Sequence, residues 1–361
     1  MLNQQTQQAG QLIAFRCDAS NTIGTGHVMR CLTLADALKQ KGATCLFVCR
    51  AAKGNIIEHI KAQGFAVHPL PENVNVEQDW QQTVAFLKTL KHPPYWLVVD
   101  HYHLDATWEG HLRPYVNHIL VIDDMANRPH MCDVLLDQNM VPDMSHRYTG
   151  LLKGKSIELL GPKYALLRPE FVEARKQVTK RTFPPKHVLV NFGGGDHKSM
   201  CLMSLRALNY MGYPGGVTLV AGGNNPDMDE LEALCAKRPN TTFYKTTDNM
   251  AELMRRADIA IGAGGATTWE RMCMGLPCVT VAIADNQVEI AKFLGENHYT
   301  FYAGLADELT PQSLATYLEE VFFDEEKFRG IEQYAMGHVD GQGAPTLAHI
   351  LLDKDSEVFK K

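Results

Sequence analysis

The amino-acid sequence predicts an α/β protein made of two doubly wound, Rossmann-like domains that face each other across a cleft. The first observation is that short apolar strands alternate with amphipathic helical stretches along the whole chain. The second is that glycine-rich turns stand between a strand and the helix that follows it. The third is the length, because 361 residues are enough for two domains of ordinary size.

The first domain is expected at residues 1–174. Strands such as the one that contains Leu97–Val99 are apolar on both faces, as the central strands of a parallel sheet are. The expected strands are Gln11–Cys17, Thr44–Cys49, Ala66–Leu70, Trp96–Asp100, His118–Ile122 and Val134–Leu136. The expected helices are His27–Lys41, Ile56–Gln63, Val76–Leu90 and Thr107–Val116.

The segment 175–185 is basic, ends in a proline pair and has no apolar periodicity, so we predict a linker there. The alternation then restarts in a second domain, expected at residues 186–361, whose last helix is able to pack back on the first domain. The expected strands are His187–Asn191, Gly216–Ala221, Thr241–Tyr244, Ile259–Gly262 and Cys278–Val281. The expected helices are Ser199–Met211, Asp227–Lys237, Met250–Arg256, Thr267–Met274 and Val288–Leu294, and the last sixty residues are expected to be mostly helical.

Composition narrows the class of protein. Apolar residues make up 45% of the chain and charged residues 21%, and the net charge of −6 argues against a nucleic-acid partner. Nine cysteines are scattered without CxxC spacing, which indicates neither a metal site nor a disulfide framework. The polar start of the sequence does not have the pattern of a signal peptide, and no apolar run approaches a membrane span. We therefore expect a cytoplasmic protein with no membrane partner, either a monomer or a weak oligomer.

The turn Gly24-Thr25-Gly26 follows a strand, and His27 and Arg30 come directly after it at the start of a helix. This order places an imidazole beside free backbone N–H groups, which suits an anionic substrate with a base in hydrogen-bonding reach. Gly24 and Gly26 are therefore candidate substrate-binding residues. Arg30, one turn beyond His27, is either a phosphate ligand or a surface cation.

This turn allows two other interpretations. A dinucleotide-binding fingerprint needs a third small residue where Met29 stands, and the next strand ends in Cys49-Arg50 without a carboxylate for a ribose. The sequence therefore disfavours a nicotinamide cofactor. The glycines of this turn also fit a turn without a ligand, with His27 as a solvated residue at the helix start.

Two further glycine clusters follow predicted strands in the second half of the chain. Gly193-Gly194-Gly195 lets backbone amides approach an oxyanion closely, and a flexible turn without a ligand is the alternative. In the second cluster, Gly264 and Gly265 lead into a helix whose N-terminus suits a diphosphate. Hydroxyl donors at Thr267 and Thr268, and Glu270 as an acceptor for the ribose hydroxyls, complete this candidate nucleotide site.

Three other features have ordinary explanations. His101 and His103 form an HxH after a strand, but a metallohydrolase would need further ligands from a barrel, which the two-domain pattern disfavours. Asp123-Asp124 also follows a strand and either contacts the sugar or water, or only caps a turn. Trp269 is expected in the core rather than as a stacking platform.

The stretches IGTGHVMR and GAGGATTWERMCMGLPCVTVAIADNQ together resemble the nucleotide-sugar-binding glycosyltransferases of the GT-B fold, which include the MurG-like enzymes. The chain is similar above all to the UDP-2,4-diacetamido-2,4,6-trideoxy-β-L-altropyranose hydrolases of pseudaminic acid biosynthesis, over roughly residues 11–345. Supporting stretches are LVVDHYHLD, VIDDMANRPHMCDVLLDQN, LLGPKYALLRPEF and NFGGGD. Two departures are His101, where a small polar residue is expected, and the run of glycines at 193–195, where a threonine more often follows two glycines.

The resemblance implies a hydrolase that releases UDP from a diacetamido trideoxy sugar and a second domain that binds UDP. It makes His27 the catalytic histidine and Tyr102, in a stretch that also holds Asp100, an active-site tyrosine. It makes the Gly264–Thr268 region the UDP-binding loop, Glu270 the ribose contact, and Asn286 and Gln287 contacts to sugar and phosphates. The candidate substrate-binding residues are then Gly24, Gly26, Arg30, Asp100, Gly194, Gly264, Gly265, Thr267, Thr268, Glu270, Asn286 and Gln287.

The expected chemistry is attack of water at the anomeric carbon, with inversion, while His27 accepts the proton of the water. A helix N-terminus disfavours an imidazolium, and the nearby diphosphate favours it, so the sequence does not decide the balance. Backbone amides and hydroxyls would stabilise the departing UDP, so we expect neither an obligatory metal nor a cofactor. The alternatives are a MurG-like UDP-sugar glycosyltransferase, a UDP-sugar 2-epimerase and a non-catalytic nucleotide-sugar binder.

Overall fold

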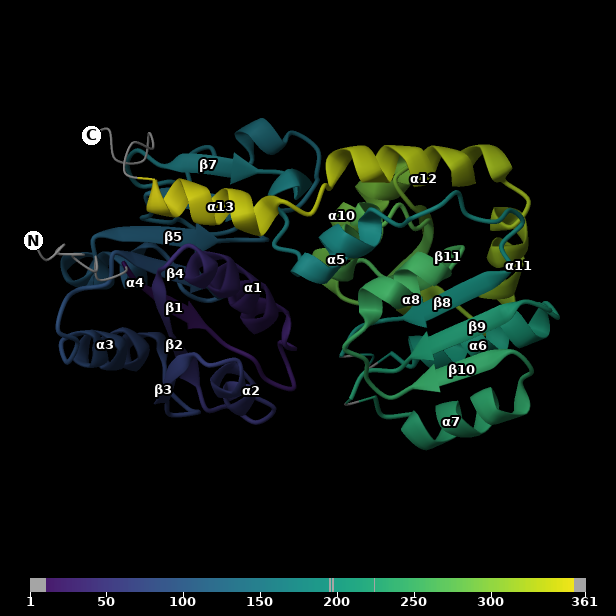
Figure 1. Ribbon diagram of the computed structural model, residues 1–361, viewed down its shortest axis with the longest axis horizontal. Coiled ribbons are helices and arrows are strands. Elements are labelled where there is room, and N and C mark those ends of the chain that lie inside the picture. The colour runs from purple at the N-terminus through teal and green to yellow at the C-terminus, as the bar shows by residue number, and fades with distance from the viewer. Residues whose placement is uncertain (1–10, 195, 197, 224, 354–361) are drawn as a thin grey trace, which may run out of the picture. The chain divides into compact units, whose positions relative to one another are not determined.

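The computed structural model describes residues 11–194, 196, 198–223 and 225–353. Within these residues the chain divides into two compact units (Figure 1). Unit 1 comprises the described residues of Met1–Gln138, Ser145–Leu160 and Gly343–Lys361. Unit 2 comprises those of Asn139–Met144 and Gly161–Gln342.

The core of unit 1 is a seven-stranded parallel sheet of order β3-β2-β1-β4-β5-β6-β7. Its central strands are apolar and buried on both faces, which is why the sequence pattern shows continuous apolar runs instead of alternation. The strands are β1 (Leu12–Cys17), β2 (Thr44–Arg50), β3 (Ala66–Leu70), β4 (Trp96–Asp100), β5 (His118–Ile122), β6 (Val134–Asp137) and β7 (Ile157–Leu160).

Helices connect the strands of unit 1 (Figure 1). Asp105 and Asn75 cap two of them with side-chain oxygens, as short polar residues do at helix starts. The last helix of the unit packs on the first one, and the indole of Trp96 donates to the backbone oxygen of Leu351. The helices are α1 (Gly26–Gln40), α2 (Ile57–Ala62), α3 (Val76–Leu87), α4 (Ala106–Leu112) and α13 (Gly343–Leu352), with 3₁₀ turns at Arg113–Tyr115 and Met144–His146.

Unit 2 is built on a six-stranded parallel sheet of order β10-β9-β8-β11-β12-β13. The strands are β8 (His187–Asn191), β9 (Gly216–Val220), β10 (Thr241–Tyr244), β11 (Ile259–Ala263), β12 (Cys278–Ala282) and β13 (Phe301–Leu305). The helices are α5 (Pro169–Arg175), α6 (Met200–Tyr210), α7 (Met228–Lys237), α8 (Met250–Arg256), α9 (Thr267–Cys273), α10 (Asp285–Glu296), α11 (Pro311–Val321) and α12 (Glu325–His338), with 3₁₀ turns at Pro162–Tyr164 and Ala306–Glu308.

The boundary between the units differs from the one expected at residues 174–186. The helix α5 belongs to unit 2, because Phe171 is fully buried in the cluster that α8 and α9 complete. The predicted linker 175–185 is also part of unit 2. Arg181 is 4% exposed, and its guanidinium donates to the backbone oxygens of Met254, Ala257, Met274 and Gly275. The basic character of the segment 175–185 therefore comes in part from a buried arginine that binds carbonyl groups, which the charge pattern of the sequence does not reveal.

Three elements were not among those expected from the sequence. The strand β7 has only four residues at a sheet edge, and β13 contains Gly304 with a φ of +112°, so both give weak strand patterns. The helix α5 starts at Pro169 and has only seven residues. Of the helices in the described residues, none is long and apolar enough to cross a membrane.

Candidate active site

The side chain of His27 lies at the start of α1, at the carboxyl edge of the unit 1 sheet. Gly24 precedes the helix with a φ of +74°, in the left-handed region, and its N–H and C=O both bond to Ser20. No side chain caps α1, although Thr25 stands at the capping position. The first backbone N–H groups of this fifteen-residue helix, beside the exposed Gly26, are therefore open to an anion.

The imidazole of His27 is held by Asp100, the last residue of β4. His27 is 5% exposed, and its Nδ1 lies 2.6 Å from Oδ1 of Asp100, which is fully buried. The guanidinium of Arg30 and the His27 ring hold the pKa of Asp100 well below its usual range, against the opposing effect of burial. An ionised carboxylate only accepts hydrogen bonds, so the proton of the neutral imidazole is on Nδ1 and Nε2 carries the lone pair.

Arg30 is buried between two carboxylates. Its Nε and Nη2 donate to Asp100 at 2.6 Å each, and its Nη1 and Nη2 donate to Asp124 at 2.9 and 2.8 Å. Arg30 is therefore not a surface cation, because its side chain is only 9% exposed. Asp100, which is a candidate substrate contact from the sequence, is fully buried, and both of its oxygens are bonded to the side chains of His27 and Arg30.

Tyr102 packs its ring edge against His27, with 4.4 Å between the ring centroids and 79° between the planes. Burial, together with Asp124, raises the pKa of the phenol to about 12. The hydroxyl is thus protonated near neutral pH and acts as a hydrogen-bond donor, not as a base. The structure brings four predicted residues of unit 1 together: His27, Arg30, Asp100 and Tyr102.

A second buried charge cluster lies beside this group at the same edge of the sheet. Asp18, directly after β1, accepts from both Arg16 and Arg50. His101 Nδ1 accepts from the backbone N–H of His103, so its proton is on Nε2, 3.2 Å from Asp18. Burial lowers the pKa of His101 to about 4. Sequence reasoning missed the pairing of Asp18 with Arg50 because the two residues lie 32 positions apart, at the ends of different strands.

In unit 2 the loop after β8 is closed by a carboxylate. Asp196 is fully buried and accepts from the backbone N–H groups of Met200 and Cys201, at 2.8 Å each. The N-terminus of α6 is therefore occupied by a side chain of the protein itself. Gly194 is exposed at this loop, and Gly195 lies outside the described residues.

The glycine loop between β11 and α9 lies against α10. A Cβ at Gly264 would be 3.2 Å from Cβ of Ala291 and 3.4 Å from Cβ of Gln287, so only glycine allows this approach without a shift. A Cβ at Gly265 would lie 3.5 Å from Nε2 of Gln287. The structure thus joins Gly264, Gly265 and Gln287, whose Oε1 accepts from the backbone N–H of Ile283.

The hydroxyl groups of α9 are organised by one arginine. Arg271 donates to Oγ1 of Thr267 at 3.0 Å and of Thr268 at 3.1 Å. Because each oxygen accepts from Arg271, each hydroxyl proton is free to point elsewhere. Asn286 is exposed in the first turn of α10, and no side chain caps this twelve-residue helix.

Glu270 lies on α9 with its side chain 17% exposed, 3.6 Å from the guanidinium of Arg168. Burial raises the pKa of Glu270, and Arg168 opposes this effect. Sequence reasoning missed Arg168, whose position about 100 residues before Glu270 leaves no local pattern. Trp269 is 2% exposed in the core, as expected.

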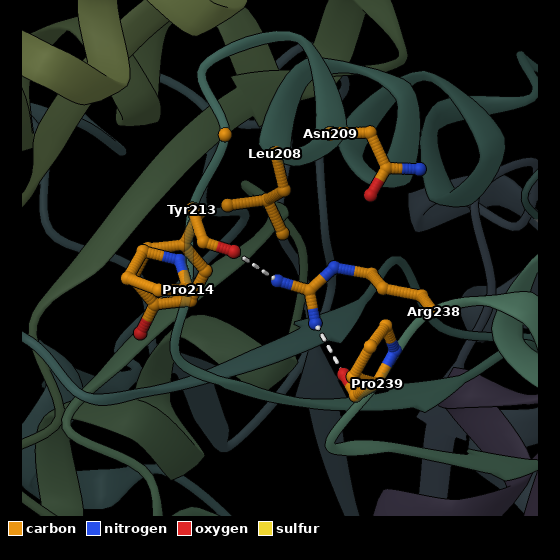
Figure 2. Close-up of a pocket in the computed structure, with 7 residues that line it drawn as sticks. Leu208, Asn209, Tyr213, Pro214, Arg238 and Pro239 are labelled. Carbon is orange, nitrogen blue, oxygen red and sulfur yellow. Dashed lines mark hydrogen bonds between the residues drawn. The ribbon is translucent and has the colours of Figure 1, made fainter.

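The remaining candidate features are metal ligands and a cavity. Among the described residues no group of three or more His, Cys, Asp or Glu is arranged to hold a metal ion. All nine cysteines are buried free thiols. A cavity of about 230 Å³ in unit 2 lies at the opposite edge of the sheet from the glycine loops, where β9 and β10 begin (Figure 2). The guanidinium of Arg238, which lines this cavity, donates hydrogen bonds to the backbone oxygens of Tyr213 and Pro239, among others. The cavity therefore offers no unpaired charge to a ligand.

Two units with parallel sheets and helices of this kind have the GT-B fold. The structure matches that of MurG from Acinetobacter baumannii with a TM-score of 0.69 and 16% sequence identity, covering 94% of this chain and 99% of that one. It matches Arabidopsis thaliana UGT89C1 complexed with UDP with a TM-score of 0.65 and 12% identity, covering 94% and 99%. At these identities the likeness shows the fold alone. Residues 214–344 match the family model of the glycosyltransferase family 28 C-terminal domain.

Curated relatives narrow the resemblance further. The chain is 24% identical over 287 residues to the UDP-2,4-diacetamido-2,4,6-trideoxy-β-L-altropyranose hydrolase of Campylobacter jejuni, covering 80% of this chain and 97% of the relative. The resemblance expected from the sequence motifs is thus confirmed. The chain is also 26% identical over 275 residues to an uncharacterized protein of Methanocaldococcus jannaschii, and 27% identical over 195 residues to the spore coat polysaccharide biosynthesis protein SpsG of Bacillus subtilis. These two matches cover 74% and 54% of this chain, which spans only 55% and 57% of those relatives.

Proposed function

We propose that the protein hydrolyses UDP-2,4-diacetamido-2,4,6-trideoxy-β-L-altropyranose, releasing UDP and the free sugar. The observation that carries the proposal is the pair of His27 and Asp100, 2.6 Å apart, at the uncapped start of α1. This pair leaves Nε2 as a base beside an anion-binding helix end. A relative with this activity in its name, matched over 97% of its length, supports the choice of substrate.

The reaction joins a water oxygen to the anomeric carbon and breaks the bond from that carbon to the diphosphate oxygen. Nε2 of His27 accepts a proton from the water, and the bonding electrons leave with UDP. Asp100 stabilises the imidazolium that forms, as the carboxylate does in other His–Asp pairs. Attack from the face opposite UDP inverts the anomeric centre. The protonated phenol of Tyr102 donates a hydrogen bond to the sugar or to the water.

In the proposed site, UDP binds to unit 2 through the loop before α9 and the first turn of α10. The hydroxyl groups of Thr267 and Thr268 and the free N–H groups of α10 donate to the diphosphate. Glu270 accepts from the ribose, with Arg168 nearby to limit the cost of its buried charge. The remaining proposed substrate contacts are Gly24, Gly26, Gly194, Gly264, Gly265, Asn286 and Gln287. These donors take the role of a metal ion at the leaving group, so hydrolysis proceeds in the presence of a chelator.

A glycosyltransferase of the MurG-like type is the second candidate. The match of residues 214–344 to the glycosyltransferase family 28 C-terminal domain favours it, since the same nucleotide site serves transfer to an acceptor. The two candidates differ in what attacks the anomeric carbon, which is water in one and an acceptor hydroxyl in the other.

The test is incubation of purified protein with the UDP-diacetamido trideoxy altrose and EDTA, without an acceptor, while UDP release is followed by NMR. Rapid release that is lost in His27→Ala supports the hydrolase. His59→Ala, which removes an exposed histidine of α2 in the same unit, is the matched control and is expected to keep full activity. UDP binding without release, followed by turnover once an acceptor is added, would establish a transferase, and binding without any turnover would leave a binder.

A further inference from the structure

We propose that Arg30 and Asp124 are positioning residues that together fix Asp100 and so set the tautomer and the protonation of His27. This inference rests on the proposed function for its kinetic part. It replaces the expectation that Arg30 is a phosphate ligand, and it gives Asp124 a role beyond capping a turn.

The geometry of Arg30 leaves little of its guanidinium for a substrate. One edge, Nε and Nη2, bonds to both oxygens of Asp100, and the other edge, Nη1 and Nη2, bonds to both oxygens of Asp124. A planar fork held on two sides has one orientation, so it fixes the carboxylate of Asp100 in turn. Asp124 follows β5 and Asp100 ends β4, so two neighbouring strands hold the arginine between them.

The charges in this group act on the imidazole in opposite directions. Asp100 favours the imidazolium, whereas the guanidinium of Arg30, with Nη2 3.2 Å from Nδ1 of His27, disfavours it. Asp124 compensates part of the charge of Arg30. Among these three groups the carboxylates outweigh the guanidinium by one negative charge, beside a base that must be neutral before water attacks. Arg147, which is paired with Asp137, also donates to the backbone oxygen of Asp124 and adds a positive charge there.

The other groups around α1 do not replace this set. Tyr102 is protonated near neutral pH, and the thiol of Cys31 lies 3.6 Å from Asp100 with its pKa raised by burial. The only titratable side chain of α13, which packs on α1, is His349, and it is exposed. The charged groups at β1 and β2 form their own cluster, in which Asp18 pairs with Arg16 and Arg50. Arg16 also pairs with Asp79 of α3.

Three substitutions separate charge from geometry. Asp124→Asn removes a negative charge, which disfavours the imidazolium, so the acidic limb of kcat/KM is expected to move to lower pH. Arg30→Gln removes a positive charge and is expected to move that limb to higher pH. Arg30→Lys keeps the charge but not the two-sided fork, so the limb stays in place while kcat falls. We expect kcat to fall roughly 10- to 100-fold in all three, with KM changed less than about 3-fold.

The tautomer of His27 is read without any assay of activity. In ¹⁵N NMR of histidine-labelled protein, with the His27 signals assigned from their loss in His27→Gln, the neutral ring is expected to carry its proton on Nδ1. The share of this tautomer is expected to fall in Asp124→Asn and in Arg30→Lys. This readout holds even if the protein does not hydrolyse the proposed substrate, so the two proposals fail separately.

The matched control is Asp133→Asn. Asp133 pairs with Arg113 in the same unit, but it precedes β6 and so lies at the opposite edge of the sheet from the His27 group. The Asp133→Asn variant loses a negative charge, as Asp124→Asn does, and it also loses an ion pair. Neither the tautomer of His27 nor the acidic limb of kcat/KM is expected to change in it. An unchanged tautomer in Asp124→Asn and Arg30→Lys, or limbs that move in the same direction in Asp124→Asn and Arg30→Gln, would overturn the proposal.

Discussion

The two nitrogens of His27 have different surroundings, and this difference decides what the side chain can do. Nδ1 faces an ionised carboxylate at 2.6 Å and the guanidinium of Arg30 at 3.2 Å, whereas Nε2 takes part in neither contact. The low pKa of Asp100 means that this arrangement persists at every pH at which the protein is expected to work. A single buried carboxylate therefore selects the tautomer of the base.

Removing that carboxylate charge tests the role of Asp100. Asp100→Asn is expected to lower the kcat of UDP release by about 10³-fold, because the amide can donate to the ring and so favour the wrong tautomer. Affinity for UDP, measured by calorimetry, is expected to remain within about 2-fold of the wild type. A kcat within a few-fold of the wild type would contradict the assignment.

His101 makes a different, pH-dependent prediction. Its pKa is about 4 in the folded protein, below the usual 6.5, so the unfolded state takes up the proton first as the pH falls. The free energy of unfolding is therefore expected to lose up to about 3 kcal/mol between pH 6.5 and pH 4, at 1.4 kcal/mol per pH unit. In His101→Asn this loss is expected to disappear from urea unfolding curves, whereas His103→Asn, an exposed neighbour, is expected to retain it.

At the scale of elements, the starts of α1 and α10 at the candidate sites have no side-chain cap, a feature that they share with several other helices. The start of α6 is occupied by Asp196, whereas α1 and α10 have no side-chain cap. A free helix N-terminus holds partial positive charge and unpaired N–H groups, both of which favour an anion. The approach of the loop before α9 to α10 brings further donors to one of these ends.

This approach depends on Gly264. Gly264→Ala places a Cβ 3.2 Å from Ala291, so α10 or the loop must shift. We expect the Kd for UDP, measured by calorimetry, to rise by roughly 10-fold. Gly337→Ala in α12 of the same unit has no atom within 4 Å of its Cβ and should bind UDP as the wild type does. Equal affinities of the two variants would show that the loop is not part of the nucleotide site.

At the scale of the whole molecule, the chain passes between the two units more than once. The described residues of Asn139–Met144 and Gly161–Gln342 form unit 2, and α13 returns to unit 1. The segment 175–185, which the sequence suggests is a linker, is tied to unit 2 by Arg181, which reaches four backbone oxygens.

Arg181→Ala tests this assignment. Removing the guanidinium leaves the carbonyl groups without their donors, and we expect unit 2 to lose about 3 kcal/mol or more of its free energy of unfolding. Lys180→Ala, at an exposed neighbouring position, is expected to change it by less than about 0.5 kcal/mol. Equal stabilities of the two variants in denaturant titrations would mean that the segment does behave as a linker.

Most strands and helices were predictable because their signals are local. β3, β4, β5, β8 and β10 have the bounds expected from the sequence, and α8 has the bounds expected from its periodicity. The strand β7 and the helix α5 were missed, whereas β10 and α8 have the same lengths and were found, so short length alone does not explain the misses. The glycine turn and the resemblance predicted the residues around His27, but the sequence did not predict which of them bond to one another.

The sequence by itself determined the α/β class, the two-sheet architecture and the position of His27 at the start of a helix, because apolar periods and glycine turns act within a few residues. The tertiary structure alone decided that Arg30 joins Asp100 and Asp124, which lie 70 and 94 positions away along the chain. It also decided that Arg181 is internal, whereas the packing of α13 in unit 1 agrees with what the sequence analysis allowed for the last helix. Contacts between distant segments depend on how strands are ordered in a sheet, and a single sequence has no local pattern that records this order.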